Sequence, residues 1–170
     1  MASLTSSNGV SITVTASTRY IISTSGRATS LKRYKHLLQT LLKLDVAYIP
    51  ISNAENGPIK PEMYAAVLRG MNCIGGAISK DIKHGIIPFL DELDDSAAGI
   101  SSVNTVIVRR SSSSRSNLIG YNTDVIGFKV AVSKACELLL SRKQVVIKSA
   151  VCYGYGGVTS VVVDVSILFL

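Results

Sequence analysis

Apolar residues along the chain recur at two spacings, one typical of strands and one typical of helices. Residues 9–17 (GVSITVTAS) place apolar and polar residues at alternate positions, which predicts a first strand. In residues 30–44 (SLKRYKHLLQTLLKL) the leucines recur at helical spacing, which predicts a helix with Ser30 as its N-cap. The chain is therefore expected to begin with a strand, a Ser/Thr/Gly-rich stretch and a helix.

The same two spacings continue along the rest of the chain. The further predicted elements are a strand at 46–51, a helix at 61–71, a strand at 72–79, a segment at 81–93 that runs into a helix, strands at 101–110 and 117–124, a helix at 126–142 and a strand at 144–157. Strands that alternate with helices are typical of an α/β domain. The strand pair near 103–123 breaks this alternation, so we expect a mixed, mostly parallel sheet flanked by helices.

Composition narrows the class of protein without identifying it. The chain has 170 residues, of which 47% are hydrophobic and 17% charged, enough for a packed core in one domain or in one domain plus part of another. Its three cysteines, Cys73, Cys136 and Cys152, show no paired spacing, and it has only two histidines, so we expect no metal site and a cytoplasmic location. The apolar run at 161–170 is too short to span a bilayer, so no membrane partner is expected.

The positive charge is concentrated near the N-terminus. The net charge is +7, and no acidic residue precedes Asp45. Such a basic end can contact phosphates. The chain lacks, however, the interleaved aromatic and basic residues and the helix-turn-helix spacing that nucleic-acid binders show, so nucleic acid is not the expected main partner.

Two polar clusters interrupt the strand-like sequence near residues 101–124. They are VNT at 103–105 and YNTD at 121–124, separated by a serine- and arginine-rich loop at 109–117. Taken alone, Asn104 and Asp124 are typical of turns or strand edges, and a lysine such as Lys83 is typical of a solvated surface. The acidic run DELDD at 91–95 is likewise interpreted as a solvated helix end.

The order of these motifs is more specific than any one of them. KHGIIPFLDEL, SSVNTV, GYNTDVIGF, a helix and a strand ending in YGYGG resemble, in this order, the shikimate dehydrogenase family, including the quinate/shikimate dehydrogenases, over about residues 10–163. The resemblance implies a substrate-binding domain at 8–125 and an incomplete Rossmann-like dinucleotide-binding segment at 126–170. It also implies NADP-linked interconversion of 3-dehydroshikimate and shikimate, with NAD left open as the cofactor.

The resemblance further implies roles for individual residues. Lys83 and Asp124 correspond to the catalytic pair, because oxidation of a ring carbinol requires a group that exchanges the hydroxyl proton. Asn104, which can both donate and accept hydrogen bonds, corresponds to a substrate-binding residue. The remaining implied site residues are Ser79, Thr29 and Ser30 for the substrate and Gly154, Gly156 and Gly157 for the cofactor pyrophosphate.

The chain departs from the family pattern in three places. Residues 77–83 read AISKDIK where the family has NVTxPHK, so Ser79 keeps a hydroxyl but Ala77 and Asp81 replace an asparagine and a proline. Residues 28–36 read ATSLKRYKH where the family has Ser-Leu-Ser, which leaves Lys32 or Arg33 as alternative partners for a substrate carboxylate. Only sixteen residues follow Gly154, which predicts an impaired enzyme.

Two interpretations of function therefore stay open. The first is a shikimate dehydrogenase-like oxidoreductase that acts on a small hydroxy acid. The alternative is a non-catalytic module that binds a shikimate- or quinate-like acid. A homodimer is compatible with either.

Overall fold

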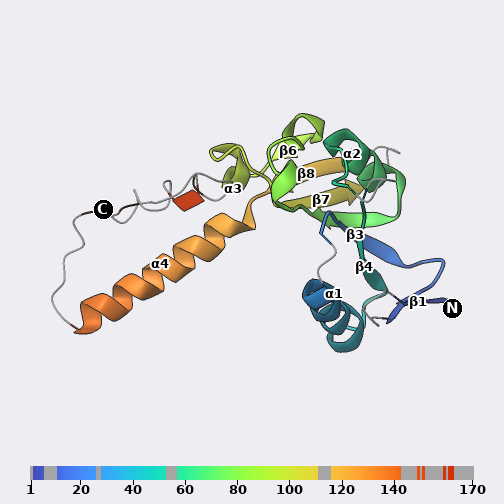
Figure 1. The fold of residues 1–170 in the computed structure, drawn as a ribbon, viewed down its shortest axis with the longest axis horizontal. Helices are drawn as coiled ribbons and strands as arrows, with labels where there is room; N and C mark the ends of the chain where they lie inside the picture. Colours follow the sequence, from blue (N-terminus) through green and yellow to red (C-terminus); the bar gives the residue numbers. More distant parts are fainter. Residues whose placement is uncertain are drawn as a thin grey trace.

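A mixed six-stranded sheet forms the centre of the protein (Figure 1). The computed structural model describes residues 2–5, 11–25, 28–52, 57–110 and 116–142, together with 149, 151, 159, 161 and 162. The strands of this sheet, in spatial order, are β4 (Val46–Pro50), β3 (Arg19–Ser23), β5 (Cys73–Ala77), β7 (Thr105–Arg110), β8 (Ser116–Tyr121) and β6 (Glu92–Leu93). Two further strands, β1 (Ala2–Thr5) and β2 (Ser11–Val14), form a separate antiparallel pair.

Strand direction in the sheet is mixed, as the sequence predicts. β3 runs parallel to both β4 and β5, and β6 runs parallel to β8, whereas β7 is antiparallel to both of its neighbours. The β7–β8 hairpin pairs Thr105 with Tyr121 at one end and Arg110 with Ser116 at the other. Because Asn104 directly precedes this ladder and Asn122 directly follows it, the two polar clusters of the sequence meet at one end of the hairpin.

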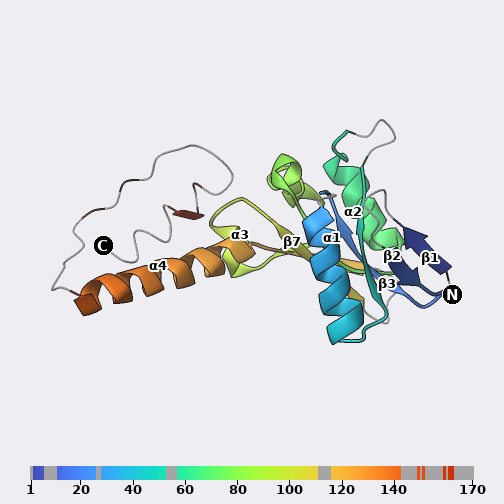
Figure 2. The same cartoon turned by 60° about the horizontal axis from the view of Figure 1, so that its bottom comes forward.

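Helices cover both faces of the sheet (Figure 2). On one face, α2 (Pro61–Gly70) buries Tyr64 and Leu68 against a core that includes Ile22 and Val106. On the other face, α1 (Ala28–Lys35) and the wide-turned η1 (His36–Leu41) bury one leucine each against β4. The long helix α4 (Thr123–Arg142) follows β8 and extends away from the sheet (Figure 1).

The start of the chain differs from the prediction. The strand expected at 9–17 contributes only β2, which pairs with β1 outside the main sheet. The strand between β4 and β5 is β3, in a stretch that the Ser/Thr/Gly-rich composition had obscured. The expectation that Ser30 is an N-cap is wrong, because α1 already begins at Ala28 and Ser30 lies inside its first turn.

The segment predicted to run into a helix at 81–93 is also different. It forms two short 3₁₀ turns, η2 (Lys80–Ile82) and η3 (Ile87–Phe89), and then β6, while a helix, α3 (Asp95–Ala98), begins only after it. Tertiary contacts explain this, because the Asp91 carboxylate binds Arg69 at 2.8 Å and accepts the Leu118 N–H at 2.7 Å. The acidic run at 91–95 is thus not a helix end: Asp91 and β6 lie at the edge of the sheet, while Asp94 caps the start of α3 and Asp95 is the exposed first residue of that helix.

The predicted strand at 144–157 lies, apart from Ser149 and Val151, outside the described residues. Among the helices that the structure describes, none combines the length and the apolar character needed to cross a membrane.

Candidate active site

A lysine and a carboxylate from distant parts of the chain form an ion pair at the start of α4. Lys83 follows the turn η2, and its Nζ lies 2.7 Å from Oδ2 of Asp124, the second residue of α4. The Lys83 side chain is only 14% exposed and that of Asp124 is 37% exposed. The first turn of a helix favours negative charge, so α4 stabilises the Asp124 carboxylate while that carboxylate holds the ammonium. Sequence-predicted partners 41 residues apart are therefore brought together.

Asn104 lies beside this pair and is anchored through its side-chain oxygen. Its Oδ1 accepts hydrogen bonds from the Thr123 N–H at 3.0 Å, the Thr123 hydroxyl at 3.2 Å and the Thr105 hydroxyl at 2.9 Å. No partner for its Nδ2 is found among the described residues. The side-chain NH₂ group of Asn104 is therefore the group that can contact a ligand, and it does so as a hydrogen-bond donor.

Ser79 is held by a threonine that sequence reasoning did not single out. The Thr24 hydroxyl donates to Ser79 Oγ at 2.8 Å and accepts the Ser79 N–H at 2.7 Å. Because Ser79 Oγ accepts from Thr24, its own hydrogen remains available to a ligand. The signal for Thr24 in the sequence was only its place directly after an apolar stretch, which did not distinguish it from its neighbours.

A cavity of about 400 Å³ adjoins this hydroxyl pair. Its polar lining comes from Thr24, Ser52 and Asp81, and its apolar lining from the end of β4 and the residues after it. Asp81 is the residue that replaces the family's proline, so this departure places a carboxylate on the cavity wall.

The other predicted site residues are less closely tied to the ion pair. Ser30 is half-buried in α1, and within the described ranges no hydrogen bond joins it to Lys83, Asn104 or Asp124. For Thr29 the structure describes the backbone alone. The side chains of Lys32 and Arg33, the alternative carboxylate partners, are exposed on α1. Gly154, Gly156 and Gly157 lie outside the described residues, so their contact with a cofactor stays a prediction of the resemblance.

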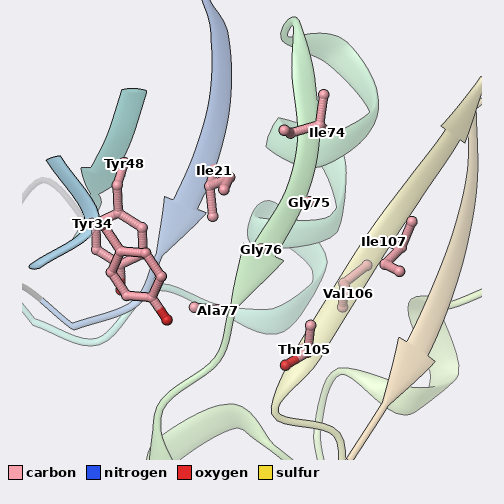
Figure 3. A pocket seen from close by; sticks show the side chains of 10 residues that line it. All are labelled: Ile21, Tyr34, Tyr48, Ile74, Gly75, Gly76, Ala77, Thr105, Val106 and Ile107. Atoms are coloured by element: carbon pink, nitrogen blue, oxygen red, sulfur yellow. The ribbon is translucent and has the colours of Figure 1, made fainter. Parts of the chain in front are cut away.

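A second, more apolar groove runs over the face of the sheet that α1 covers only in part (Figure 3). Its volume is about 260 Å³. One wall is the stacked pair Tyr34 and Tyr48, whose ring centroids are 4.3 Å apart, and the opposite wall is β7 with Ile107 (Figure 3). Such a surface does not offer the converging polar groups that a polyhydroxylated acid requires.

Side chains that could ligate a metal ion are not clustered in the part of the chain that the structure describes. Within those residues no cluster of three or more His, Cys, Asp or Glu side chains could hold an ion.

Several known proteins with similar sequence or fold are named shikimate dehydrogenases. No family model matches the chain. Shikimate dehydrogenase (NADP(+)) from Geobacillus kaustophilus is 33% identical over 95 residues, which cover 54% of this chain and 33% of that enzyme. The crystal structure of shikimate dehydrogenase from Aquifex aeolicus superposes with a TM-score of 0.61 and 25% identity, covering 92% of this chain and 54% of that one.

A third match comes from a liganded enzyme. Shikimate 5-dehydrogenase from Listeria monocytogenes, whose structure is a complex with shikimate and NAD, superposes with a TM-score of 0.66 and 23% identity, covering 93% of this chain and 51% of that one. At this identity the match shows the fold alone. The chain spans about a third of the length of the curated relatives it matches and about half of the solved chains.

The fold and the site define a class of protein, an α/β domain with a mixed sheet that carries a lysine–aspartate ion pair at a helix start. Within that class, the chain is similar in sequence and fold to shikimate dehydrogenases in particular. This confirms the resemblance that the order of motifs predicts.

Proposed function

We propose that this chain provides the substrate-binding part of an NADP-linked, shikimate dehydrogenase-like oxidoreductase that interconverts 3-dehydroshikimate and shikimate. Residues 8–125 would form the substrate domain and residues 126–170 the start of the cofactor domain. The observation that carries the proposal is the Lys83–Asp124 ion pair, with Asn104 bound to the same helix start. The names of the relatives support the substrate and the cofactor.

Each residue of the site has a distinct task in this reaction. NADP would supply or accept the hydride, with Gly154, Gly156 and Gly157 as its proposed contacts. In the oxidative direction the neutral Lys83 amine takes the proton of the substrate hydroxyl, and in the reductive direction the ammonium returns it to the carbonyl oxygen. Asp124 holds the amine in place and accepts a hydrogen bond from a substrate hydroxyl. The Asn104 amide and the Ser79 hydroxyl donate to substrate oxygens.

Ligand binding to the purified chain tests the proposal without requiring turnover. We expect shikimate to raise the melting temperature, and the Lys83→Gln variant to bind it about tenfold more weakly, because a hydrogen bond to a charged group is lost. Lys60→Gln is the matched control, since Lys60 is an exposed lysine outside the site. Equal shikimate affinity in wild type and Lys83→Gln would contradict the assignment of this site.

A non-catalytic acid-binding module is the second candidate, because Asp81 and the altered Ser-Leu-Ser segment depart from the family pattern. Titration with shikimate, quinate and NADPH separates the two functions. Stabilisation by an acid and by NADPH supports the oxidoreductase, whereas stabilisation by an acid alone supports the binding module. Oxidation of NADPH with dehydroshikimate by the 170 residues would show that they are sufficient for turnover.

We place either function in the cytoplasm, because the cysteine spacing favours a reducing compartment.

A further inference from the structure

Asn122 is a fully buried polar residue directly before α4, and sequence reasoning assigns it no role. Its side-chain oxygen accepts the Asp124 N–H at 3.1 Å. Its side-chain amide donates to the backbone oxygen of Ser102 at 2.8 Å, and its own N–H donates to Ser96 Oγ at 3.1 Å. A buried amide with every one of these contacts satisfied holds its neighbours in one arrangement.

The Ser102 contact connects Asn122 to the other half of the ion pair. Ser102 is fully buried and precedes Val103, whose N–H donates to the backbone oxygen of Lys83 at 3.0 Å. A continuous path of hydrogen bonds and backbone therefore runs from Asp124 through Asn122, Ser102 and Val103 to Lys83. The residues at the two ends of this path are the ones whose side chains form the ion pair, with Lys83 Nζ 2.7 Å from Asp124 Oδ2.

We propose that Asn122 is a positioning residue that sets Asp124 in register with Lys83. Its side-chain oxygen orients the first turn of α4, and its amide ties that turn to the segment that holds the Lys83 backbone. Asn104 accepts the N–H of Thr123, so two asparagines that flank the hairpin, one directly before β7 and one directly after β8, align the first two N–H groups of α4. The importance of this alignment for shikimate rests on the proposed function, but the geometric effect on Lys83 does not.

Substitution of Asn122 by serine distinguishes a residue that only caps α4 from one that also positions Asp124 against Lys83. Serine is a good N-cap and can still accept the Asp124 N–H, but its side chain is one bond shorter than that of asparagine and does not reach the Ser102 backbone oxygen. Asn122→Ser therefore removes the link to the Lys83 segment and keeps the cap. Asn122→Ala removes both, and Asp124→Asn removes the partner charge itself.

Acylation of Lys83 reports on the ion pair in the full chain. Only a neutral amine is nucleophilic, so an ammonium that is partly buried against a carboxylate reacts slowly with acetic anhydride. The modified fraction of Lys83 is measured by mass spectrometry relative to the exposed Lys60. Asp124→Asn is expected to raise the relative acylation of Lys83 about fivefold, the scale of a modest ion pair. Asn122→Ser is expected to reproduce most of that rise while the chain stays folded, which a single cooperative thermal transition shows.

The outcomes separate this inference from the proposed function. If Asp124→Asn accelerates acylation and Asn122→Ser does not, Asn122 is only a cap and the inference is overturned. If neither variant changes the rate, no ion pair exists in solution for Asn122 to position, which also overturns it. If both accelerate acylation but shikimate neither protects Lys83 nor stabilises the wild type, the positioning role stands and the proposed function fails.

Discussion

At the scale of single residues, hydrogen bonds within the protein decide what each polar group can still offer a ligand. The side-chain oxygen of Asn104 accepts three hydrogen bonds. One comes from Thr105, the next residue in the chain, and two come from Thr123, which directly precedes Asp124. The motif predicts an asparagine that both donates hydrogen bonds to a ligand and accepts them from it. In the folded chain the side-chain oxygen is occupied by these internal hydrogen bonds, and only the side-chain NH₂ group remains available to a ligand. Motifs thus indicate residue types, but the remaining capacity of each group depends on neighbours brought in by the fold.

Asp45 offers a residue-scale test that involves pH. The hydroxyls of Thr18, Thr15 and Ser17 donate to its carboxylate at 2.5, 2.9 and 3.0 Å. The Thr18 hydrogen bond, followed by that of Thr15, lowers the pKa of Asp45 below its ordinary value of 3.8. A lowered pKa in the folded state contributes stability that is present above pH 3.8 and is lost as the pH falls through the folded value.

We expect Thr18→Val, which keeps the side-chain shape and removes the hydroxyl, to raise the pKa of Asp45. Carbon-detected NMR of the Asp45 carboxyl group measures it directly. The pH dependence of stability below pH 3.8 should become correspondingly shallower. Thr13→Val is the matched control, because the Thr13 side chain makes no hydrogen bond to Asp45 among those found. An unchanged Asp45 pKa in Thr18→Val would show that this hydroxyl does not act on the carboxylate.

At the scale of elements, the contact between α2 and β5 shows how the sheet is held under its site. The Tyr64 hydroxyl of α2 donates to the backbone oxygen of Ile22 in β3 at 2.8 Å. It passes so close to β5 that a Cβ atom on Gly76 would lie 2.1 Å from it. Glycine at this position therefore lets a helix reach across one strand to bind the next. Lys83 follows β5 along the chain, and Asn104 directly precedes β7, which is the neighbour of β5 in the sheet.

Gly76→Ala should destabilise the fold, because the added methyl group displaces a buried tyrosine. We expect a loss of about 1–3 kcal/mol in the free energy of unfolding, typical of an overpacked core. Urea titration followed by circular dichroism measures the change. Gly70→Ala is the control, since no atom lies within 4 Å of a Cβ there and alanine favours the helix. Equal stability of wild type and Gly76→Ala would contradict the close packing of Tyr64.

Elements differ in how far their local sequence predicts them. The helices α2 and α4 and the β7–β8 hairpin were predicted within a few residues, because each has a strong period, a turn or a proline at its start. The segment at 81–93 was not, because Asp91 and its partners pull it onto the edge of the sheet. Local periodicity cannot report a competing contact with residues that are distant in the sequence.

At the scale of the whole molecule, a contact links the C-terminal part of the chain to the start of α4. Val161 is fully buried in a small cluster with Ile100 and Val125, and Phe128 packs against it. Val125 directly follows Asp124, so this cluster supports the helix start that carries the carboxylate. Residues beyond α4 therefore help to stabilise the site although they belong to the proposed cofactor segment.

Val161→Ala is expected to destabilise the chain by about 1–2 kcal/mol, because two methyl groups leave a buried cluster. Urea unfolding measures the loss, and hydrogen exchange of the first turn of α4 should increase with it. Val151→Ala makes the same chemical change at a side chain that is 92% exposed, and it should leave both measurements unchanged. Wild-type stability of Val161→Ala would mean that the cluster does not form in solution.

The sequence alone determined the α/β class, the mixed sheet, and the order of motifs that resembles shikimate dehydrogenases, because these depend on periodicity and on residue types that are local. The site roles of Lys83, Asn104 and Asp124 were predicted in the same way and remain to be tested. Only the tertiary structure decided that β3 lies inside the sheet, that Thr24 holds Ser79, and that buried Asn122 links the two halves of the ion pair. Such contacts join residues far apart in the chain, and their geometry exists only once the sheet has formed and water has been excluded from between its elements.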